Sequence, residues 1–575
     1  MTPTILFTTL LCLLSACASP NEMQPTPVET EELPALPTST SIVTPGATRT
    51  AQPRLSPTTY GPELEDFPSG VNPLTGREVA EPALLDFPAV LVSISNMPVT
   101  ARPQAGPSFA SWVYELYIGE GTTRFMSVFY GDAPRAIPNV TGGCEVREAN
   151  TRPKNDWIGN RVWLDENENG RQDAWEAGVG GVCVRLLDGT SREVLSETTT
   201  DSNGYYAFEH PDEEAIIQFV ASDFYEFTKS NISDEDRDSD ADASTGETVI
   251  TQADSTASHW DAGLILSQEP LPPPSPVVTG TPPNWYIPSE PYVGPVRSGR
   301  LTYNHIGDMF PNGCLAYAGA ASDIGERLDA CEIVYGVDRT TPNSALLTVT
   351  RLRELAEGSL NPSQPVNYSG NLFSDTPLQG GQAANSMHVF YHSHSQSGWQ
   401  YDPVSETYLR YTDQADGTGT LLPATDRLTA RQMAFENVIV VFAEHNRFRH
   451  NQLEVDFRFG QKQPAYLFRN GQAFQIYWST VNREWEKRTG LLRPMHFVDA
   501  QDNLVPLHPG RTWIHIVTPY STVTDQGNNE WLIRFVQPPD PTDTPIPSET
   551  AVPSETPMPS ETPMSSVTPS ETPTP

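Results

Sequence analysis

The sequence predicts a multidomain protein: an all-β sandwich with mixed α/β regions on both sides of it, followed by a mostly β C-terminal domain, with disordered Pro-, Thr- and Ser-rich ends. Three observations predict this arrangement. Short alternating or apolar runs separated by turn signals indicate a sandwich at 150–267. Longer apolar runs mixed with helical patterns lie on both sides of it. The ends of the chain contain too few apolar residues to offset the entropy of ordering.

Residues 1–17 predict a secretory signal that ends in a lipid attachment site. They form an apolar run that closes on Leu-Ser-Ala-Cys and is too short for a transmembrane helix. This ending resembles the bacterial lipobox, in which the cysteine, here Cys17, is diacylated and becomes the mature N-terminus. No Lys or Arg precedes the apolar run, and an ordinary secretion signal is the alternative. The resemblance implies a membrane partner reached through a lipid anchor, at the cell membrane or outer surface.

Composition sets the remaining boundaries. Residues 18–60 are mostly Pro, Thr, Ser and Glu, and residues 538–575 repeat Pro-Ser-Glu-Thr, so both predict disordered spacers. The chain between them is long enough for about three domains. We expect the first part of the α/β domain at 61–135, the sandwich at 150–267, a Pro-rich linker at 268–285, the second part of the α/β domain at 286–370, and the C-terminal domain at 380–537.

The formal net charge of −37 argues against a nucleic-acid partner, because phosphate contacts need clustered Lys and Arg. It suits a surface protein that has divalent cations available.

Four cysteines remain once the signal is removed and Cys17 carries lipid. They allow three pairings, and an oxidising compartment favours two disulfides. We favour Cys144 with Cys183 and Cys314 with Cys331, because the partners in each pair are nearest in sequence.

An acidic loop in the predicted sandwich has the spacing of a twelve-residue calcium site. Counted from position 1, its oxygen ligands fall at 1, 3, 5, 7, 9 and 12, and Gly170 stands at position 6, where the chain must turn sharply. Calcium takes six to eight hard oxygens, which this loop supplies without Cys or His. An unliganded acidic turn is the alternative. The ligand set is Asp165, Asn167, Asn169, the backbone carbonyl of Arg171, Asp173 and Glu176.

A second acidic run, at 234–246, predicts a second calcium site beside the first. It places Asp236, Asp238, Asp240 and Asp242 at every other position, and a solvated acidic loop is the alternative. We expect strands rather than helices around the first loop, which disfavours an EF-hand pair. The expected strands are 160–164, 181–187, 193–199, 204–208, 215–221, 248–251 and 258–264.

This region resembles an SdrD B-like module, an immunoglobulin-like domain of bacterial surface adhesins. The segments that carry the resemblance are IGNRVWLDENENGRQDAWEAGVGGVCVRLL, TTTDSNGYYAFEH, DSDADASTGETVIT and HWDAGL, within 156–266. The resemblance implies that calcium stiffens the domain and performs no chemistry. It also implies that the domain serves mostly as a stalk or spacer.

The segments on either side of the module resemble the YerB-type lipoprotein family, a bacterial domain of unknown function. In that family the segment ending in Thr-Arg-Phe leads quickly to Gly-Pro-Val-Arg-Ser, so the sandwich is expected to be an insertion between them. The ARPQ segment has one residue more than the family pattern. The matching segments are NPLTGREV, FPAVLVSISNMPVTARPQAGPSFASWVYEL, GEGTTRFMSVFYG and YVGPVRSGRLTYNHIGDMF, together with the C-terminal region 385–536.

Within the interrupted domain we expect both strands and helices. Apolar, β-rich runs predict strands at 89–94, 123–130 and 315–320. Helices are expected at 108–117, 324–330 and 344–356.

Four arginines in the family-like segments predict an anion site: Arg102, Arg124, Arg297 and Arg300. Guanidinium groups suit phosphate or carboxylate, and the rest of the chain is strongly acidic. The alternative is that Glu115 and Glu120 neutralise these arginines in structural ion pairs.

The expected function is non-enzymatic binding or scaffolding at the cell envelope, with a cell-wall polymer or a surface protein as partner. The sequence contains no recognised nucleophile, metalloprotease, P-loop or dinucleotide motif, and we name no catalytic residue. His388, His392 and His394 have a spacing that a transition metal could use, with surface histidines of a strand as the alternative. Two hypotheses stay open: an enzyme or transferase that grips anionic cell-wall polymers through the four arginines, and an adhesin with the sandwich as its stalk.

Overall fold

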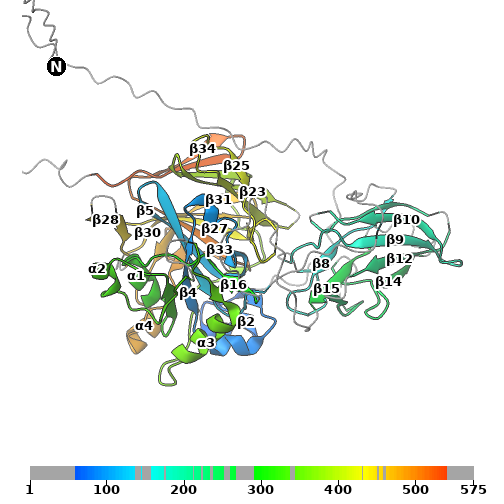
Figure 1. Ribbon diagram of the computed structural model, residues 1–575, viewed down its shortest axis with the longest axis horizontal. Helices are drawn as coiled ribbons and strands as arrows, with labels where there is room; N and C mark the ends of the chain where they lie inside the picture. The colour runs from blue at the N-terminus through cyan, green and yellow to red at the C-terminus, as the bar shows by residue number, and fades with distance from the viewer. Residues whose placement is uncertain are drawn as a thin grey trace, which may run out of the picture.

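The computed structural model describes residues 59–135, 144, 157–266 and 290–539, with gaps at 174–175, 202, 212, 222–224, 233–236, 251–258, 337–342, 404, 430, 450–451 and 458–460. These residues form a large body and a smaller all-β domain beside it (Figure 1). The predicted signal, Cys17, the Pro-rich linker and nearly all of both predicted spacers lie outside the described residues.

The small domain contains two main sheets. Its strands are β7 (Trp157–Ile158), β8 (Val162–Leu164), β9 (Cys183–Asp188), β10 (Val194–Thr199), β11 (Phe208–Glu209), β12 (Ala215–Val220), β13 (Tyr225–Phe227), β14 (Glu247–Ile250) and β15 (Ala262–Leu266). One sheet has the order β10-β9-β12-β14 and the other β13-β15-β8, while β7 pairs with β11. Residues of both sheets, among them Val184, Ile217 and Leu264, belong to one buried apolar cluster.

The strands of this domain follow the sequence pattern closely. Six of the seven expected strands occur within a few residues of their expected bounds. The expected strand at 204–208 is reduced to β11, because the side chain of Asp201 accepts hydrogen bonds from the backbone of Asn203 and Tyr205 and holds that stretch in a turn.

The body is organised around an eleven-stranded sheet in the order β18-β17-β4-β6-β5-β33-β27-β30-β31-β21, with β32 beside β31. Parallel pairing of β17 with β4 aligns Cys314 with Val90, so the chain before the small domain and the chain after it share this sheet. The bounds are β4 (Val90–Ser95), β5 (Trp112–Gly119), β6 (Thr122–Phe129), β17 (Cys314–Tyr317), β18 (Glu332–Ile333), β21 (Gln382–Ala383), β27 (Asn437–Phe442), β30 (Gln463–Arg469), β31 (Gln472–Ser479), β32 (His496–Val498) and β33 (Thr512–Val517).

The C-terminal region continues the same sheet and adds a second one. Parallel pairing of β33 with β5 aligns Thr512 with Trp112, so the strands expected to form a separate C-terminal domain complete the sheet of the N-terminal part. The second sheet has seven strands, in the order β25-β24-β23-β22-β35-β34 with β26 beside β24. These are β22 (Ser386–His392), β23 (Ser395–Asp402), β24 (Thr407–Asp413), β25 (Leu421–Pro423), β26 (Ala434–Phe435), β34 (Thr522–Gly527) and β35 (Glu530–Arg534).

Short strand pairs and a few helices complete the body. The strand pairs are β1 (Thr59–Tyr60) with β20 (Phe373–Ser374), β2 (Val71–Asn72) with β3 (Arg77–Glu78), β16 (Tyr292–Val293) with β19 (Leu347–Thr348), and β28 (His445–Arg449) with β29 (Gln452–Val455). The α-helices among the described residues are α1 (Thr302–Asp308), α2 (Ser322–Gly325), α3 (Val349–Ser359) and α4 (Glu484–Thr489). The described fold is therefore mostly β with few helices.

The helix expected at 108–117 is wrong, because this stretch enters β5 after a short 3-10 turn at Pro107–Phe109. β5 is rich in aromatic and β-branched residues, which favour strands. All of its residues are buried, since it lies between β6 and β33 inside the sheet, so it lacks the alternation of a half-exposed strand. The helices expected at 324–330 and 344–356 occur in part, as α2 and α3.

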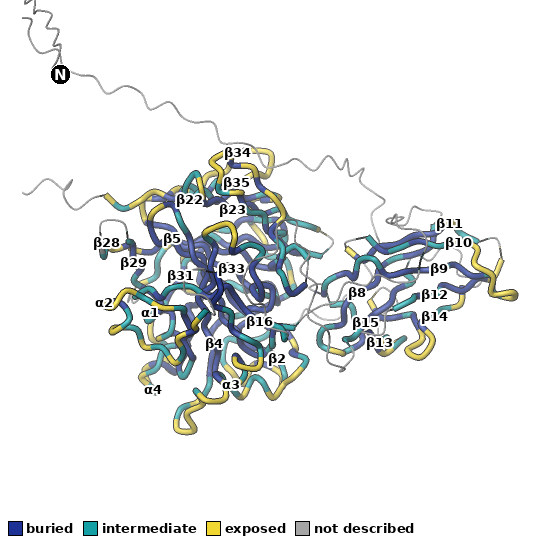
Figure 2. The backbone as a smooth tube through the Cα atoms, in the orientation of Figure 1, coloured by how far each residue is buried: buried dark blue, intermediate teal, exposed yellow. Residues whose placement is uncertain are grey.

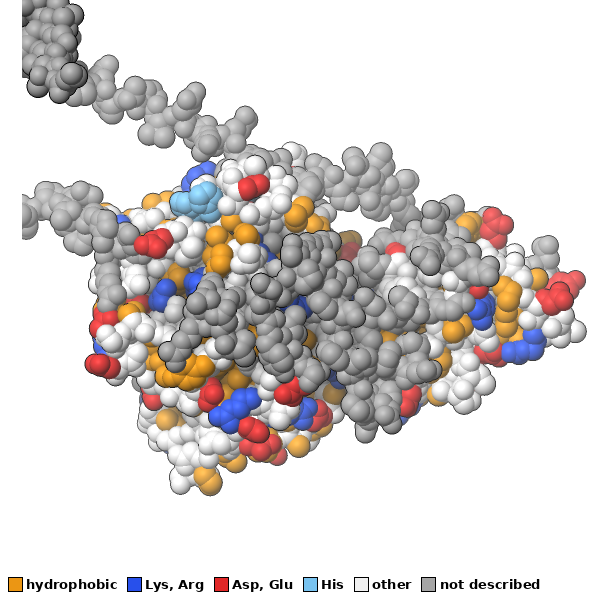
Figure 3. All heavy atoms as spheres, viewed as in Figure 1, with side chains coloured by type: hydrophobic (Ala, Val, Ile, Leu, Met, Phe, Trp, Pro, Cys, Tyr) orange, Lys and Arg blue, Asp and Glu red, His pale blue; other side chains and the backbone are white. Residues whose placement is uncertain are grey.

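Burial is concentrated where the sheets lie. In Figure 2 the strands at the centre of the body and the inner strands of the small domain are buried, while exposed segments are peripheral loops and edge strands such as β34. None of the described helices is long and apolar enough to cross a membrane. On the face shown in Figure 3, Lys and Arg side chains are scattered among acidic ones and form no broad basic patch.

Candidate functional site

Three of the four predicted arginines line one pocket of the body, with a volume of about 330 Å³. Arg124 lies on β6, and Arg297 and Arg300 lie between β16 and α1. The other lining residues are Met97, Pro98, Ile118, Gly119, Glu120, Thr122 and Gln452.

Strand pairing explains why these arginines meet. Arg124 pairs with Ser95 across β6 and β4. The segment that carries Arg297 runs along the same strand, since the backbone N–H of Arg297 donates to the carbonyl of Ser93 at 2.8 Å and that of Ser95 donates to Pro295 at 2.8 Å. The small domain therefore separates Arg124 from Arg297 and Arg300 along the chain. Backbone contacts of both segments with β4 bring these arginines together in space.

Arg124 has an unusual environment for a charged side chain. Its exposed fraction is 6%, and its Nη1 donates only to the backbone oxygen of Thr123, at 3.0 Å. Its buried Nε has no hydrogen-bond partner among the described residues. Burial, together with the positive charges of Arg297 and Arg300, lowers the pKa of Arg124 to about 9. Arg300 donates to Ser298 and to its neighbouring carbonyl, and forms no ion pair with a described residue.

Arg102 lies apart from these three arginines. Its Nη1 contacts both the backbone oxygen and the Oδ1 of Asp413, the latter at 3.4 Å, and its Nε donates to Asn96 at 3.1 Å. The structure therefore places Arg102 in an ion pair that links the N-terminal part of the body to β24, with Asp413 as its partner in place of the expected Glu115 or Glu120.

Among the described residues Glu115 forms an ion pair with Arg410 and with none of the four predicted arginines, although its charge also acts on Arg102. It lies 3.4 Å from Arg410, and both side chains are 1% exposed. Trp513 donates its indole N–H to Glu115 at 3.2 Å, and the guanidinium group of Arg410 lies 4.5 Å above the Trp513 ring. This buried pair has no access to the pocket. Glu120, by contrast, is exposed and lines the pocket at the turn between β5 and β6.

The acidic loop that begins at Asp165 turns as its spacing requires. The carboxylate of Asp165 accepts hydrogen bonds from the backbone N–H groups of Asn169 and Gly170, at 3.1 and 2.7 Å. Gly170 has φ of +79°, a left-handed conformation that glycine adopts without strain. A Cβ at this position would come within 2.5 Å of Ile232, so no other residue fits here without rearrangement.

The predicted ligand side chains gather inside this loop. Asn167 and Asn169 donate amide hydrogen bonds to Asp173 at 3.0 and 3.1 Å. Glu176 is fully buried, and burial together with the charges of Asp173 and Asp165 raises its pKa well above the usual range. None of these three carboxylates forms an ion pair with a described residue. Hard oxygen donors with uncompensated negative charge fit a divalent cation such as calcium, and either amide rotated by half a turn presents its oxygen.

Part of the second acidic run lies against the first loop. Asp238 is buried and forms a backbone bridge with Arg171. Asp240 accepts a hydrogen bond of 2.6 Å from the backbone N–H of Asp261, a fully buried residue that the sequence did not single out. Burial and the charge of Asp240 raise the pKa of Asp261 well above its usual range. Asp261 is therefore a further acidic residue of this cluster.

Asp242, another residue of the second acidic run, lies at the start of a turn. It is exposed, and its Oδ1 accepts hydrogen bonds from the backbone N–H groups of Ser244 and Thr245, each at 3.0 Å. These contacts make it the residue that caps its own turn. Asp236 lies outside the described residues.

The acidic loop also contacts the body. Glu166, the second residue of the loop, lies 3.2 Å from Arg511, and Arg135 donates to its backbone oxygen at 3.3 Å. The backbone N–H of Arg511 donates to Glu436 at 2.6 Å, and Glu436 also pairs with the buried Arg77. A charged network therefore joins the loop to the sheet of the body.

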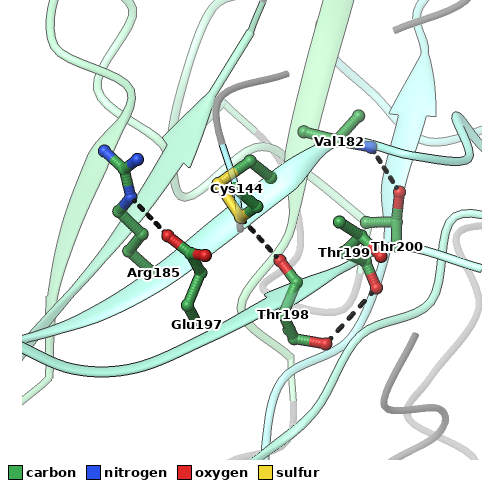
Figure 4. Close-up of a disulfide and its surroundings, with 8 residues drawn as sticks. Cys144, Val182, Arg185, Glu197, Thr198, Thr199 and Thr200 are labelled. Carbon is green, nitrogen blue, oxygen red and sulfur yellow. Dashed lines mark hydrogen bonds and ion pairs between the residues drawn. A yellow bond between two sulfur atoms is a disulfide. The ribbon is translucent and has the colours of Figure 1, made fainter. Parts of the chain in front are cut away.

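The cysteines pair as the sequence favours, Cys144 with Cys183 and Cys314 with Cys331. Figure 4 shows Cys144 beside β9 and β10, with its sulfur 3.2 Å from the carbonyl oxygen of Thr198. Along the chain Cys144 lies between β6 of the body and β7 of the small domain, and its disulfide links it to Cys183 at the start of β9. The second disulfide joins β17 to the residue before β18.

No transition-metal cluster is visible among the described histidines and cysteines. The one group of such ligand atoms within 4.8 Å of one another contains Cys144, Cys183 and Glu197, and its cysteines are already joined in a disulfide. His388 is buried and contacts Gln396 at 2.9 Å.

Family models match three consecutive parts of the chain. The N-terminal domain of a protein family of unknown function (DUF3048) matches residues 74–146, an SdrD B-like domain matches 156–264, and the DUF3048 C-terminal domain matches 387–514. The segments at 72–131 that resemble the YerB-type family overlap the N-terminal DUF3048 match, and the region 385–536 overlaps the C-terminal match, whereas the segment YVGPVRSGRLTYNHIGDMF lies outside both.

Curated relatives share a limited part of the chain. Serine-aspartate repeat-containing protein F of Staphylococcus epidermidis is 31% identical over 144 residues, which are 25% of this chain and 8% of that protein. Serine-aspartate repeat-containing protein C of Staphylococcus aureus is 39% identical over 118 residues, 20% of this chain and 12% of that protein. Colossin-B of Dictyostelium discoideum is 34% identical over 96 residues, 17% of this chain and 2% of that protein. The chain therefore spans only a small fraction of each relative.

Among solved structures, the YerB protein from Bacillus subtilis is similar with a TM-score of 0.40 and 16% identity, over 78% of this chain and 96% of that one. The family models, taken by themselves, show that the chain carries the N- and C-terminal domains of the DUF3048 family, with an SdrD B-like domain between them.

Proposed function

We propose that this protein binds an anionic ligand at the cell envelope, without catalysis, in the pocket formed by Arg124, Arg297 and Arg300. The observation that carries the proposal is the buried Arg124 guanidinium, which faces two other guanidinium groups and forms no ion pair with a described residue. A buried charge is costly unless it is paired. An anion that enters the pocket supplies the missing partner, and anionic groups of envelope components, polymers among them, are the ligand class.

The same proposal places the protein outside the cytoplasm, anchored by lipid on Cys17. The lipobox-like ending of the first segment supports the anchor. The SdrD B-like domain supports a surface location, because such modules are typical of bacterial surface adhesins.

Calcium has a structural role in this proposal. The oxygen-rich loop from Asp165 to Glu176 and the adjoining Asp238, Asp240 and Asp261 would hold the cation or cations, and the chemistry supplied is charge neutralisation alone. The domain then acts as a stiff module that projects from the body.

An enzyme or transferase acting on anionic cell-wall polymers is the second candidate. The observation that favours it is Glu120, a carboxylate that lines the same pocket as the arginines. Its exposed position on a turn provides none of the burial that would adapt it to proton transfer.

An adhesin with the sandwich as its stalk is the third candidate. The large exposed apolar residues of the four-stranded sheet lie on its two opposite edge strands, with Val194 and Leu195 on β10 and Val249 on β14. They therefore form no continuous apolar groove on that sheet for a partner.

Binding of polyanions by the full chain, purified in detergent, tests the proposed function. Fluorescence anisotropy with labelled polyphosphate, polyglutamate and neutral dextran should show binding of a polyanion and none of dextran. Arg124→Gln should weaken that binding about tenfold, the effect of losing charge-assisted hydrogen bonds. Arg488→Gln, which removes an exposed arginine on α4, is the matched control and should leave binding unchanged. Equal affinity of both variants would overturn the proposal.

A further inference from the structure

We infer that the arginine pocket recognises a phosphate monoester in preference to a carboxylate. This inference rests on the proposed function and names the anion that the pocket selects.

The placement of the arginines on separate segments favours a tetrahedral anion. Arg124 lies on β6, whereas Arg297 and Arg300 lie on the segment that runs along β4, so two separate segments supply the arginines that line the pocket. A phosphate group presents three terminal oxygens in different directions, so several guanidinium groups can donate to it at once. A carboxylate presents two oxygens in one plane, which a single guanidinium group can satisfy.

The charge balance of the lining residues favours an anion with two negative charges. The lining contains three arginines and one acid, Glu120, so two positive charges are in excess. Glu120 is exposed, and water screens its attraction for Arg124 more than it would at a buried position. A phosphate monoester carries about −1.5 to −2 at neutral pH, which matches this excess, whereas one carboxylate leaves a positive charge beside the buried Arg124.

The size and the apolar wall of the pocket favour an ester over inorganic phosphate. The volume of about 330 Å³ is several times the roughly 30 Å³ that a water molecule occupies. Met97, Pro98 and Ile118 form the apolar part of the wall, and Thr122 and Gln452 add neutral hydrogen-bonding groups. An organic group attached to the phosphate can lie against this wall while the phosphate contacts the arginines.

Calorimetric titration of the full chain in detergent with three small probes tests the inference. Glycerol 3-phosphate, a phosphate monoester, should bind at least about tenfold more tightly than succinate, which carries two separate carboxylates, and more tightly than inorganic phosphate. Its affinity should rise between pH 5 and pH 7, as the ester loses its second proton at a pKa of about 6.

Two variants link this binding to the pocket. Arg124→Gln should weaken glycerol 3-phosphate about tenfold, and Arg300→Gln, at a less buried position, should do so if the first variant fails to fold. Arg488→Gln should match the wild type. Thermal unfolding of each variant checks that the body remains folded.

The outcomes separate this inference from the proposed function. Succinate binding as tightly as glycerol 3-phosphate would overturn the preference for phosphate while leaving an anion pocket. Binding of polyanions to a pocket that rejects all three probes would also overturn it, because the pocket would then require a polymer. Loss of all binding, polyanions included, would overturn both. Vesicles that contain phosphatidic acid, compared with phosphatidylcholine vesicles, distinguish a lipid phosphate from a sugar or polyol phosphate as the source.

Discussion

Glu176 in the inserted domain and Glu115 in the body are both almost completely buried, but their surroundings differ. Glu176 lies beside Asp165 and Asp173 and forms no ion pair with a described residue. Glu115 pairs with Arg410, receives a hydrogen bond from Trp513, and lies under an aromatic cluster. In the body, the charge of Glu115 is therefore neutralised by a side chain of the protein itself. In the inserted domain, the charges of Asp165, Asp173 and Glu176 need a cation from solution to balance them.

This difference teaches how the two parts depend on their environment. The stability of the body should follow from contacts within the chain and from pH. The stability of the inserted domain should follow from the cation concentration. Two unfolding transitions with separate responses are therefore expected from one chain.

The largest effect is expected from breaking the buried pair of the body. Arg410→Met leaves Glu115 buried without its partner and should lower the free energy of unfolding of the body by about 3–5 kcal/mol. Urea unfolding followed by tryptophan fluorescence measures this change. The double variant Glu115→Gln, Arg410→Met is the control and should recover part of the loss. An unchanged midpoint for Arg410→Met would show that the pair adds nothing to stability.

Removal of calcium should have an effect of similar size on the other part. At a free calcium concentration about 1,000 times Kd, binding contributes about 4 kcal/mol. Calorimetry of the full chain should show the transition of the inserted domain moving to lower temperature with a chelator, while that of the body stays in place. In Glu176→Gln this transition should already lie low and respond little to calcium. If chelation moves neither transition, calcium does not stabilise the inserted domain through the acidic loop.

Acidification should weaken the body through His388. Burial, with a smaller contribution from the charge of Arg534, lowers the pKa of His388 to about 4, from 6.5 in the unfolded chain. The unfolded state therefore takes up the proton first, so stability is complete above about pH 6.5 and is lost as pH falls toward 4. The loss should approach about 3 kcal/mol.

The free energy of unfolding of the body, measured as a function of pH, reports this loss. In His388→Gln that free energy should fall less steeply between pH 6.5 and pH 4. His445, whose pKa burial also lowers to about 4, should leave a residual slope in that variant. A profile that is identical in wild type and variant would contradict the role assigned to His388.

The smallest effect is expected at the contact between the two parts. Arg511→Gln removes the ion pair with Glu166 but keeps the backbone hydrogen bond to Glu436. Because this pair is partly exposed, we expect a loss of about 1 kcal/mol or less from the calcium-dependent transition. A double-mutant cycle with Glu166→Gln measures the coupling. A coupling energy of zero would mean that the inserted domain and the body unfold without influence on each other through this contact.

Local features of the fold were predictable because their causes lie within a few residues. Gly170 at position 6 of the acidic loop predicted a sharp turn, and the structure has a left-handed backbone there. Alternating residues between turn signals predicted most strands of the inserted domain. The helix expected at 108–117 was wrong because β5 is buried on both faces, a property conferred by its neighbours β6 and β33.

The candidate pocket was predictable only in its residue types. The four arginines stand out in the sequence as cations in an acidic chain, but no local pattern separates Arg102, which pairs with Asp413, from Arg124, which forms no such pair with a described residue. Asp261 escaped notice for the same reason, since its closeness to Asp240 depends on how distant segments pack.

Local sequence is enough to predict the turns, the strand periods, the spacing of the acidic loop residues and the order of the family-like regions, because each depends on nearby side chains or on the order of segments along the chain. The tertiary structure decided which charges meet. It placed Arg297 beside Arg124 through pairing along β4, Glu115 beside Arg410, and the acidic loop against Arg511. The physical reason is that the energy of a charged group depends on its burial and on its nearest opposite charge, and both are properties of distant segments brought together by the sheets.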